Sequence, residues 1–142
     1  MTPLKFLVST AFLSVVTGCW QGPSYEGKPL DQWMVLAKDK SAETRKAAAK
    51  ALGRLGLQTE EVLPTLIDLV KDENPGVQIQ AIFALRELSP RAESALPALE
   101  KIVGDTNQNL AVRRNAAKTA RLIQRGQVGN GPRPPGPPVP LK

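Results

Sequence analysis

Histidine is absent from the chain, and cysteine occurs once, at Cys19. Without histidine there is no imidazole to act as a general base, complete a catalytic triad or bind a metal. A single cysteine cannot form an internal disulfide, and elsewhere in the chain there is no thiol for nucleophilic catalysis or an iron–sulfur centre. These absences exclude the enzyme classes that depend on those groups. We therefore expect no catalytic residue, no metal ligand and no cofactor.

The one cysteine closes an apolar N-terminal segment. Lys5 carries a positive charge, the run Phe6 to Val16 is almost wholly apolar, and small residues lead into Cys19, as in a secretory signal peptide. The ending, aliphatic-small-Gly-Cys, resembles the lipobox of bacterial lipoproteins. That resemblance implies cleavage before Cys19 and a diacylglycerol on its thiol. The alternatives are an ordinary signal peptide or an uncleaved anchor, although the run is shorter than the ~20 residues of a spanning helix.

Lipidation at Cys19 would set the location of the protein. Two or three acyl chains give lasting membrane association, since each buried methylene contributes roughly 0.8 kcal/mol. We expect a signal peptide over 1–18, a tether over 19–28 and a folded part outside the cytoplasm. Trp20, rather than aspartate, follows the cysteine. By resemblance to lipoprotein sorting in double-membraned bacteria, this favours the outer membrane.

The central part of the chain repeats itself every 33 residues, as the positions of Asp39, Asp72 and Asp105 show. Each unit starts with apolar residues spaced i, i+3, i+6/7, which predicts one face of a short helix. A polar turn with the aspartate follows, and then a second helix with alanine and leucine at its core positions. The third unit has two extra residues in its turn. We therefore predict an all-α fold of three helix pairs, at 29–56, 62–89 and 95–125.

The second helices carry a family resemblance. The segments Thr44–Gly53 (TRKAAAKALG) and Val112–Lys118 (VRRNAAK) resemble HEAT repeats, particularly the short bacterial kind similar to phycobilisome-lyase repeats. The resemblance covers 29–125 and implies a short right-handed α-solenoid. In that family the turn aspartate and an arginine at the start of the second helix can bridge adjacent repeats. The matching residues are Asp39, Asp72, Asp105, Arg45 and Arg113, but Gln78 interrupts the arginine series. The alternative role for the aspartates is to cap helices or form turns.

The two ends of the repeat region differ from its middle. Trp33 occupies a position that leucine fills in later units, and we expect its ring to seal the N-terminal end of the stack. Residues 126–142 hold six prolines and four glycines, a composition that prevents helices and sheet ladders. We predict a disordered tail with polyproline II character there.

The outer face of the second helices is the predicted binding surface. When residues are placed at 100° intervals around each helix, Ile79 and Phe83 of the middle unit form an apolar centre on this face. Lysines and arginines of the first and third units flank it. We assign to this surface Lys46, Lys50, Ile79, Phe83, Arg86, Arg114, Lys118 and Arg121. It suits an acidic protein partner with an apolar anchor. The alternative is that the middle helix is apolar because it packs on both sides, with the cations as a solvated face.

The resemblance also requires that enzymes be considered. HEAT-like deoxyhypusine hydroxylases bind iron through His-Glu pairs, which this chain lacks, and the chromophore-binding residues of bilin lyases have no match here. We therefore predict a membrane-anchored, non-catalytic scaffold for protein–protein interaction in the cell envelope. We expect no nucleic acid and no small-molecule substrate. A purely structural envelope component without a specific partner is the alternative, followed by a bilin lyase-like enzyme.

Overall fold

The computed structural model describes residues 22–128. Cys19, the predicted signal peptide and residues 129–142 of the predicted tail lie outside the described residues. Within residues 22–128, no helix is long and apolar enough to cross a membrane.

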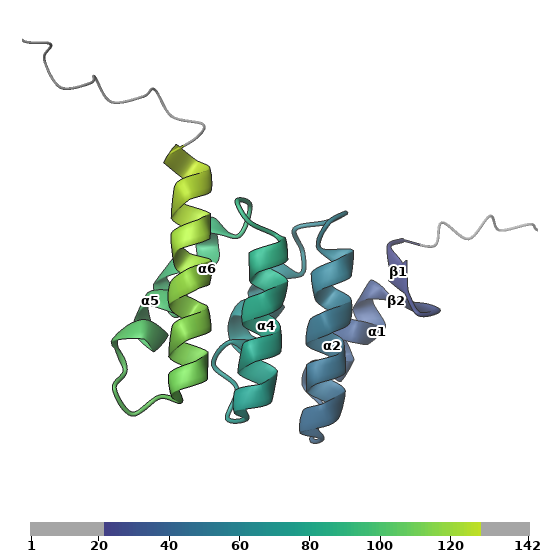
Figure 1. The fold of residues 1–142 in the computed structure, drawn as a ribbon. Helices are drawn as coiled ribbons and strands as arrows, with labels where there is room; N and C mark the ends of the chain where they lie inside the picture. The colour runs from purple at the N-terminus through teal and green to yellow at the C-terminus, as the bar shows by residue number, and fades with distance from the viewer. Residues whose placement is uncertain (1–21, 129–142) are drawn as a thin grey trace, which may run out of the picture.

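Six α-helices in three pairs make up most of the described chain (Figure 1). They are α1 (Leu30–Leu36), α2 (Ala42–Leu55), α3 (Leu63–Leu69), α4 (Pro75–Glu87), α5 (Leu96–Gly104) and α6 (Leu110–Val128). A short 3₁₀ helix, Glu93–Ala95, precedes α5, and a hairpin of β1 (Ser24–Tyr25) and β2 (Lys28–Pro29) precedes α1. The fold is mostly helical, and the prediction of a short HEAT-like α-solenoid is confirmed.

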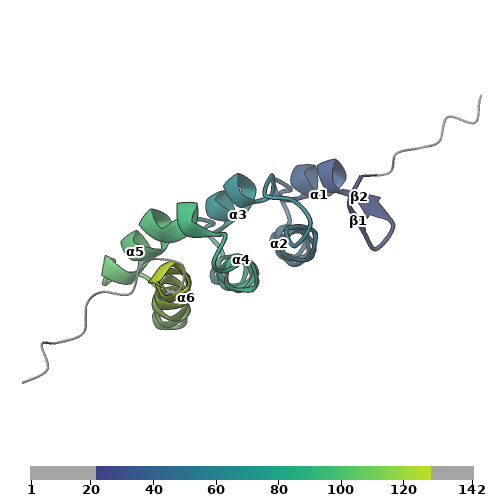
Figure 2. The ribbon, with the colours of Figure 1, turned by 90° about the horizontal axis from the view of Figure 1, so that it is seen from above.

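The helices form two layers, which are seen from above in Figure 2. The first helices of the pairs (α1, α3, α5) form one layer, and the second helices (α2, α4, α6) form the other. Each second helix packs on the first helix of its own pair, and α4 packs between α2 and α6. Every repeat therefore buries its apolar surface against its neighbours, as expected for a solenoid.

Small residues let the second helices lie close together. The alanine and leucine positions predicted from the repeat are all buried: Ala48, Ala51, Leu52, Leu55, Ala81, Ala84, Leu85, Leu88, Ala116, Thr119, Ala120 and Ile123. At the contact of α2 with α4, a Cβ added to Gly53 would lie 2.8 Å from the Cβ of Ala84. No larger side chain fits there without moving one of the helices.

The repeating aspartates shape the turn before each second helix. The carboxylates of Asp39, Asp72 and Asp105 each accept a hydrogen bond from the backbone N–H two residues later, at 2.8, 2.9 and 3.0 Å. Such a bond closes a turn that a backbone carbonyl would otherwise close. The turn then leads to the helix N-cap. In the second repeat this cap is Asn74, whose side chain accepts from the N–H groups of Gly76 and Val77.

Part of the predicted tether is folded. Residues 24–29 form the hairpin, and its two central residues, Glu26 and Gly27, have φ angles of 48° and 72°. Positive φ at both positions is typical of the tightest hairpin turns. The indole N–H of Trp33 donates to the carbonyl of Tyr25 at 3.0 Å, and the ammonium of Lys28 lies 5.0 Å from the centroid of that indole ring. The hairpin thus covers the buried tryptophan at the N-terminal end of the stack.

The last helix runs beyond the predicted boundary at 125. It includes Gly126, which the composition places at the start of the tail. A Cβ at Gly126 would collide with the ring of Pro90. The absence of a side chain at this position therefore lets the end of α6 pass close to the turn that follows α4.

Candidate functional site

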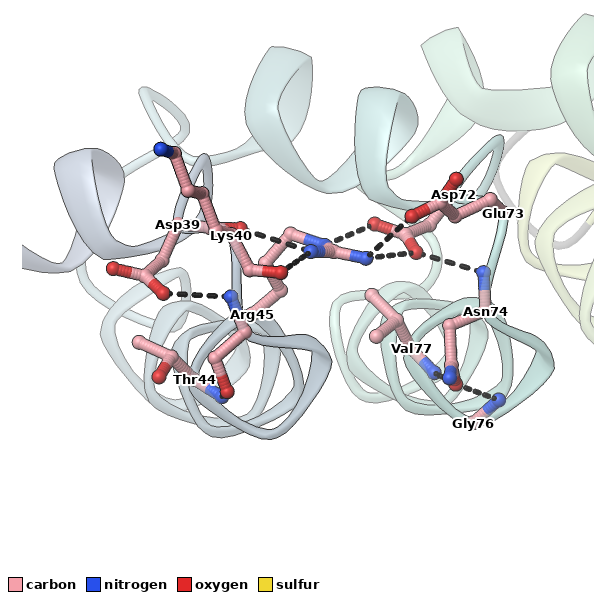
Figure 3. Close-up of polar contacts among 10 residues, drawn as sticks. Asp39, Lys40, Thr44, Arg45, Asp72, Glu73, Asn74, Gly76 and Val77 are labelled. Atoms are coloured by element: carbon pink, nitrogen blue, oxygen red, sulfur yellow. Dashed lines mark hydrogen bonds and ion pairs between the residues drawn. The ribbon is translucent and has the colours of Figure 1, made fainter.

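A buried ion pair joins the first two repeats (Figure 3). The guanidinium of Arg45, from the first turn of α2, contacts both carboxylate oxygens of Asp72: Nε to Oδ2 at 2.6 Å and Nη2 to Oδ1 at 2.9 Å. Its Nη1 donates to the backbone carbonyls of Asp39 and Lys40, at 2.9 and 3.0 Å. One side chain thus connects the turn of its own repeat to the turn of the next.

The surroundings of this pair favour its charged form. The side chains of Arg45 and Asp72 are only 11% and 8% exposed. Burial alone would raise the pKa of Asp72, but the hydrogen bonds from Arg45 and from the N–H of Asn74 outweigh it, and the pKa lies below its usual value. The hydrogen bond to Asp72 likewise raises the pKa of Arg45. A bidentate pair of this kind fixes the relative position of two elements.

The same bridge is not repeated between the second and third units. Gln78 stands where Arg45 stands in the first unit; it is buried and lines a hollow of about 220 Å³ that Asp105 also lines. Arg113 donates its Nε–H to the carbonyl of Val103, within its own repeat, at 3.3 Å. The structure therefore pairs Arg45 with Asp72 and leaves Asp105 as a turn residue. Arg45 and Asp72 therefore connect the first repeat to the second.

The predicted surface lies on one layer of the fold. Its cations are exposed and project from α2 (Lys46, Lys50), α4 (Arg86) and α6 (Arg114, Lys118, Arg121). Its two apolar residues on α4 are only half-exposed. Ile79 packs against the core, and the ring of Phe83 lies under the guanidinium of Arg86, 4.7 Å from the ring centroid.

Only three of the eight residues predicted for this surface line a common hollow. Arg86, Lys118 and Arg121 line one hollow of about 290 Å³ between α4 and α6, together with Leu122 and Arg125. Sequence reasoning missed the last two residues. The signal that could have found them is the helical spacing from Lys118, since i+4 and i+7 fall on the same face as i+3. Lys46 and Lys50 lie on α2, away from this hollow.

Charge is divided between the two layers. The helices α2, α4 and α6 carry ten lysines and arginines but only two carboxylates, Glu43 and Glu87. The rest of the described chain carries six lysines and arginines and eleven carboxylates. Helix α6 alone has five arginines and lysines and no acidic residue. The layer of second helices is therefore strongly basic, while the remainder is acidic.

Comparison with known families agrees with this architecture. A family model described as HEAT repeat matches residues 30–58, and a second, described as HEAT repeats, matches residues 63–130. The chain carries HEAT repeats. No curated protein matches this HEAT-repeat protein at a significant level. HEAT-repeat families are typically non-catalytic scaffolds that mediate protein–protein interactions. Residues 22–128 contain no cluster of three or more histidine, cysteine, aspartate or glutamate side chains that could hold a metal ion.

Proposed function

We propose that this HEAT-repeat protein is a non-catalytic scaffold that binds an acidic protein partner on the face formed by α2, α4 and α6. The observation that carries the proposal is the division of charge between the layers. Eight exposed cations and two exposed carboxylates on three adjacent helices create a positive field on one face of the molecule. Such a field raises the association rate with an acidic surface and disfavours basic ones.

The partner also needs an apolar contact, because exposed charge pairs alone add little affinity. Two residues on this face can supply it. Phe83 is half-exposed beside Arg86, and Leu122 on α6 is 43% exposed. An acidic segment with an apolar side chain matches this combination.

We further propose that the scaffold is tethered to a membrane of the cell envelope through a lipid on Cys19. The lipobox-like ending of the apolar N-terminal run supports this. Four residues separate Cys19 from the hairpin at Ser24. Even fully extended, the five steps from Cys19 to Ser24 span at most about 18 Å. A lipid at Cys19 would thus hold the solenoid next to the bilayer, and we favour the outer membrane where there are two.

Co-purification from detergent-solubilised membranes tests the scaffold function. The test variant is Lys50→Glu with Lys118→Glu, which reverses two charges on the second-helix layer. The matched control is Lys38→Glu with Lys101→Glu, two exposed lysines outside that layer. We expect a stoichiometric partner that the wild type and the control retain and the test variant loses. Equal retention by all three proteins would contradict the proposed face. The absence of any stoichiometric partner would favour a purely structural component.

A further inference from the structure

The hollow between α4 and α6 concentrates positive charge. Lys118, Arg121 and Arg125 project into it from successive turns of α6, and Arg86 faces them from α4. From Lys118 to Arg125 the helix rises about 10 Å. Four cations thus line an open surface hollow of about 290 Å³, and no carboxylate lines it.

These four cations have no internal counter-charge in the described chain. The ion pairs within residues 22–128 involve Arg45, Lys46, Arg54 and Lys71, and none involves a cation of the hollow. Arg86 contacts the ring of Phe83 instead. Like charges gathered in one concavity repel each other, and the hollow focuses their field on any anion that enters.

Helix ends account for only part of this arrangement. Arg86 and Arg125 lie in the last turns of their helices, where cations interact favourably with the helix dipole. Lys118 and Arg121 lie in the middle of α6, where the dipole offers no such benefit. Their position beside the other two cations offers a place for an external anion.

The chemistry of the lining favours phosphate over carboxylate. Three of the four cations are arginines, whose planar donors bind the oxygens of phosphate in a bidentate manner. A carboxylate brings one negative charge and two oxygens. A phosphate monoester brings up to two charges and three terminal oxygens at neutral pH. It therefore neutralises more of the local charge in the same volume.

We propose that the hollow lined by Arg86, Lys118, Arg121 and Arg125 is a binding site for a phosphate monoester. The phosphate lies between α4 and α6 and accepts hydrogen bonds from Lys118 and Arg121, with Arg86 and Arg125 completing the neutralisation. Leu122 adds an apolar wall for the group that the phosphate is attached to. This site shares Arg86, Lys118 and Leu122 with the proposed docking face, but its test uses the purified protein and needs no protein partner.

Calorimetric titration of the full chain, purified in a non-ionic detergent, tests the site. The probes are inorganic phosphate and, as a carboxylate control, acetate, both at low ionic strength because salt screens exposed charges. The test variant is Lys118→Gln with Arg121→Gln. The control variant is Lys46→Gln with Lys50→Gln, which removes the same charge from α2. All four residues are exposed, so unchanged thermal melting of each variant checks the fold.

The expected result is a dissociation constant for phosphate below about 1 mM, a value at which binding is worth roughly 4 kcal/mol. The test variant should weaken binding at least tenfold, and the control variant less than twofold. Equal weakening by both variants would show a general charge effect and overturn the site. Acetate binding as tightly as phosphate would also overturn it.

A second titration distinguishes the two sources of the phosphate. The probe is dihexanoylphosphatidic acid, a short-chain lipid with a monoester phosphate, and dihexanoylphosphatidylcholine is its control. In one outcome, the phosphatidic acid binds at least tenfold tighter than inorganic phosphate, and the double variant Lys118→Gln, Arg121→Gln loses this binding. That result would support the site with a lipid as ligand. Affinity equal to that of inorganic phosphate would support it with a soluble ester. Phosphatidylcholine carries its phosphate as a diester, so equal binding of the two lipids would overturn recognition of the monoester.

Discussion

Arg45 and Asp72 form a bidentate ion pair across the junction of the first two repeats, with atom-to-atom distances of 2.6 and 2.9 Å. The two residues are 27 positions apart, and the same offset separates Gln78 from Asp105 at the next junction. The solenoid therefore has two chemically different junctions: the first is closed by an ion pair, and the second has a glutamine in place of the arginine.

Replacing Asp72 by asparagine should destabilise the protein. Asparagine can still accept the turn hydrogen bond, but it leaves the buried guanidinium of Arg45 with only the exposed carboxylate of Glu73, 3.7 Å away, as a counter-charge. We expect the melting temperature at pH 7 to fall by several degrees. The control is Asp105→Asn, which changes a turn aspartate that has no arginine partner, and its melting temperature should stay close to the wild type. Equal effects of the two substitutions would contradict a special role for the ion pair.

The contribution of Asp72 should depend on pH in a defined direction. Its pKa is lowered in the folded protein, so the ion pair stabilises the fold above the ordinary carboxyl pKa of about 3.9. That stabilisation disappears as the pH falls and the carboxylate becomes protonated. Denaturant titrations should therefore show a difference between wild type and Asp72→Asn that is largest near pH 7 and narrows below pH 4. A difference that stays constant down to pH 2 would rule out this linkage.

Replacing Gln78 by arginine should create the missing bridge. Gln78 and Asp105 line the same hollow, and the offset between them equals that of the existing pair. We expect the melting temperature to rise by a few degrees. In a double-mutant cycle, adding Asp105→Asn should abolish the gain. A gain that survives this second substitution would come from something other than the new pair.

The close contact of α2 with α4 should not tolerate an added methyl group. Gly53→Ala places a Cβ 2.8 Å from that of Ala84, and such overpacking typically costs about 1–3 kcal/mol. Gly104→Ala is the control, since nothing lies within 4 Å of the added atom. Chemical denaturation should show a loss only for the first variant. Stability equal to the wild type in Gly53→Ala would mean that the helices separate without cost.

Replacing Cys19 by serine tests the proposed membrane tether. Serine has no thiol to accept a diacylglycerol, so the protein should leave the high-salt-washed membrane fraction or accumulate as an unprocessed precursor. Mass spectrometry of the wild-type N-terminus should find an acylated Cys19 as the first residue. Unchanged membrane partition of the variant under high salt would contradict the lipid anchor.

The sequence predicted the repeats well because their signal is local and periodic. The 33-residue spacing of Asp39, Asp72 and Asp105 and the alternation of alanine with leucine are sufficient to place three helix pairs. Which of these aspartates also bridges repeats depends on a residue 27 positions earlier, so the three turns look alike in sequence but differ in contacts. Gln78 already marked one junction as different in the sequence, but only the folded arrangement shows that Arg45 pairs with Asp72 while Arg113 bonds within its own repeat.

Two other features were hidden for physical reasons. The hairpin depends on positive φ angles at Glu26 and Gly27, and glutamate is not one of the residues that signals such a turn. The charged hollow is assembled from α4 and α6, whose facing residues are about 35 positions apart. Periodicity placed Lys118 and Arg121 on one face of a helix, but it could not show that Arg86 lies opposite them.

Site-specific photo-cross-linking in intact cells tests most directly whether a protein partner docks on the face formed by α2, α4 and α6. A photoreactive amino acid at Lys50 or Leu122 samples the layer of second helices, and the same group at Val35 or Lys101 samples the other layer; all four side chains are exposed. We predict a discrete adduct with one protein of acidic sequence from positions 50 and 122, and none from positions 35 and 101. Adducts from all four positions, or from positions 35 and 101 alone, would contradict docking on α2, α4 and α6.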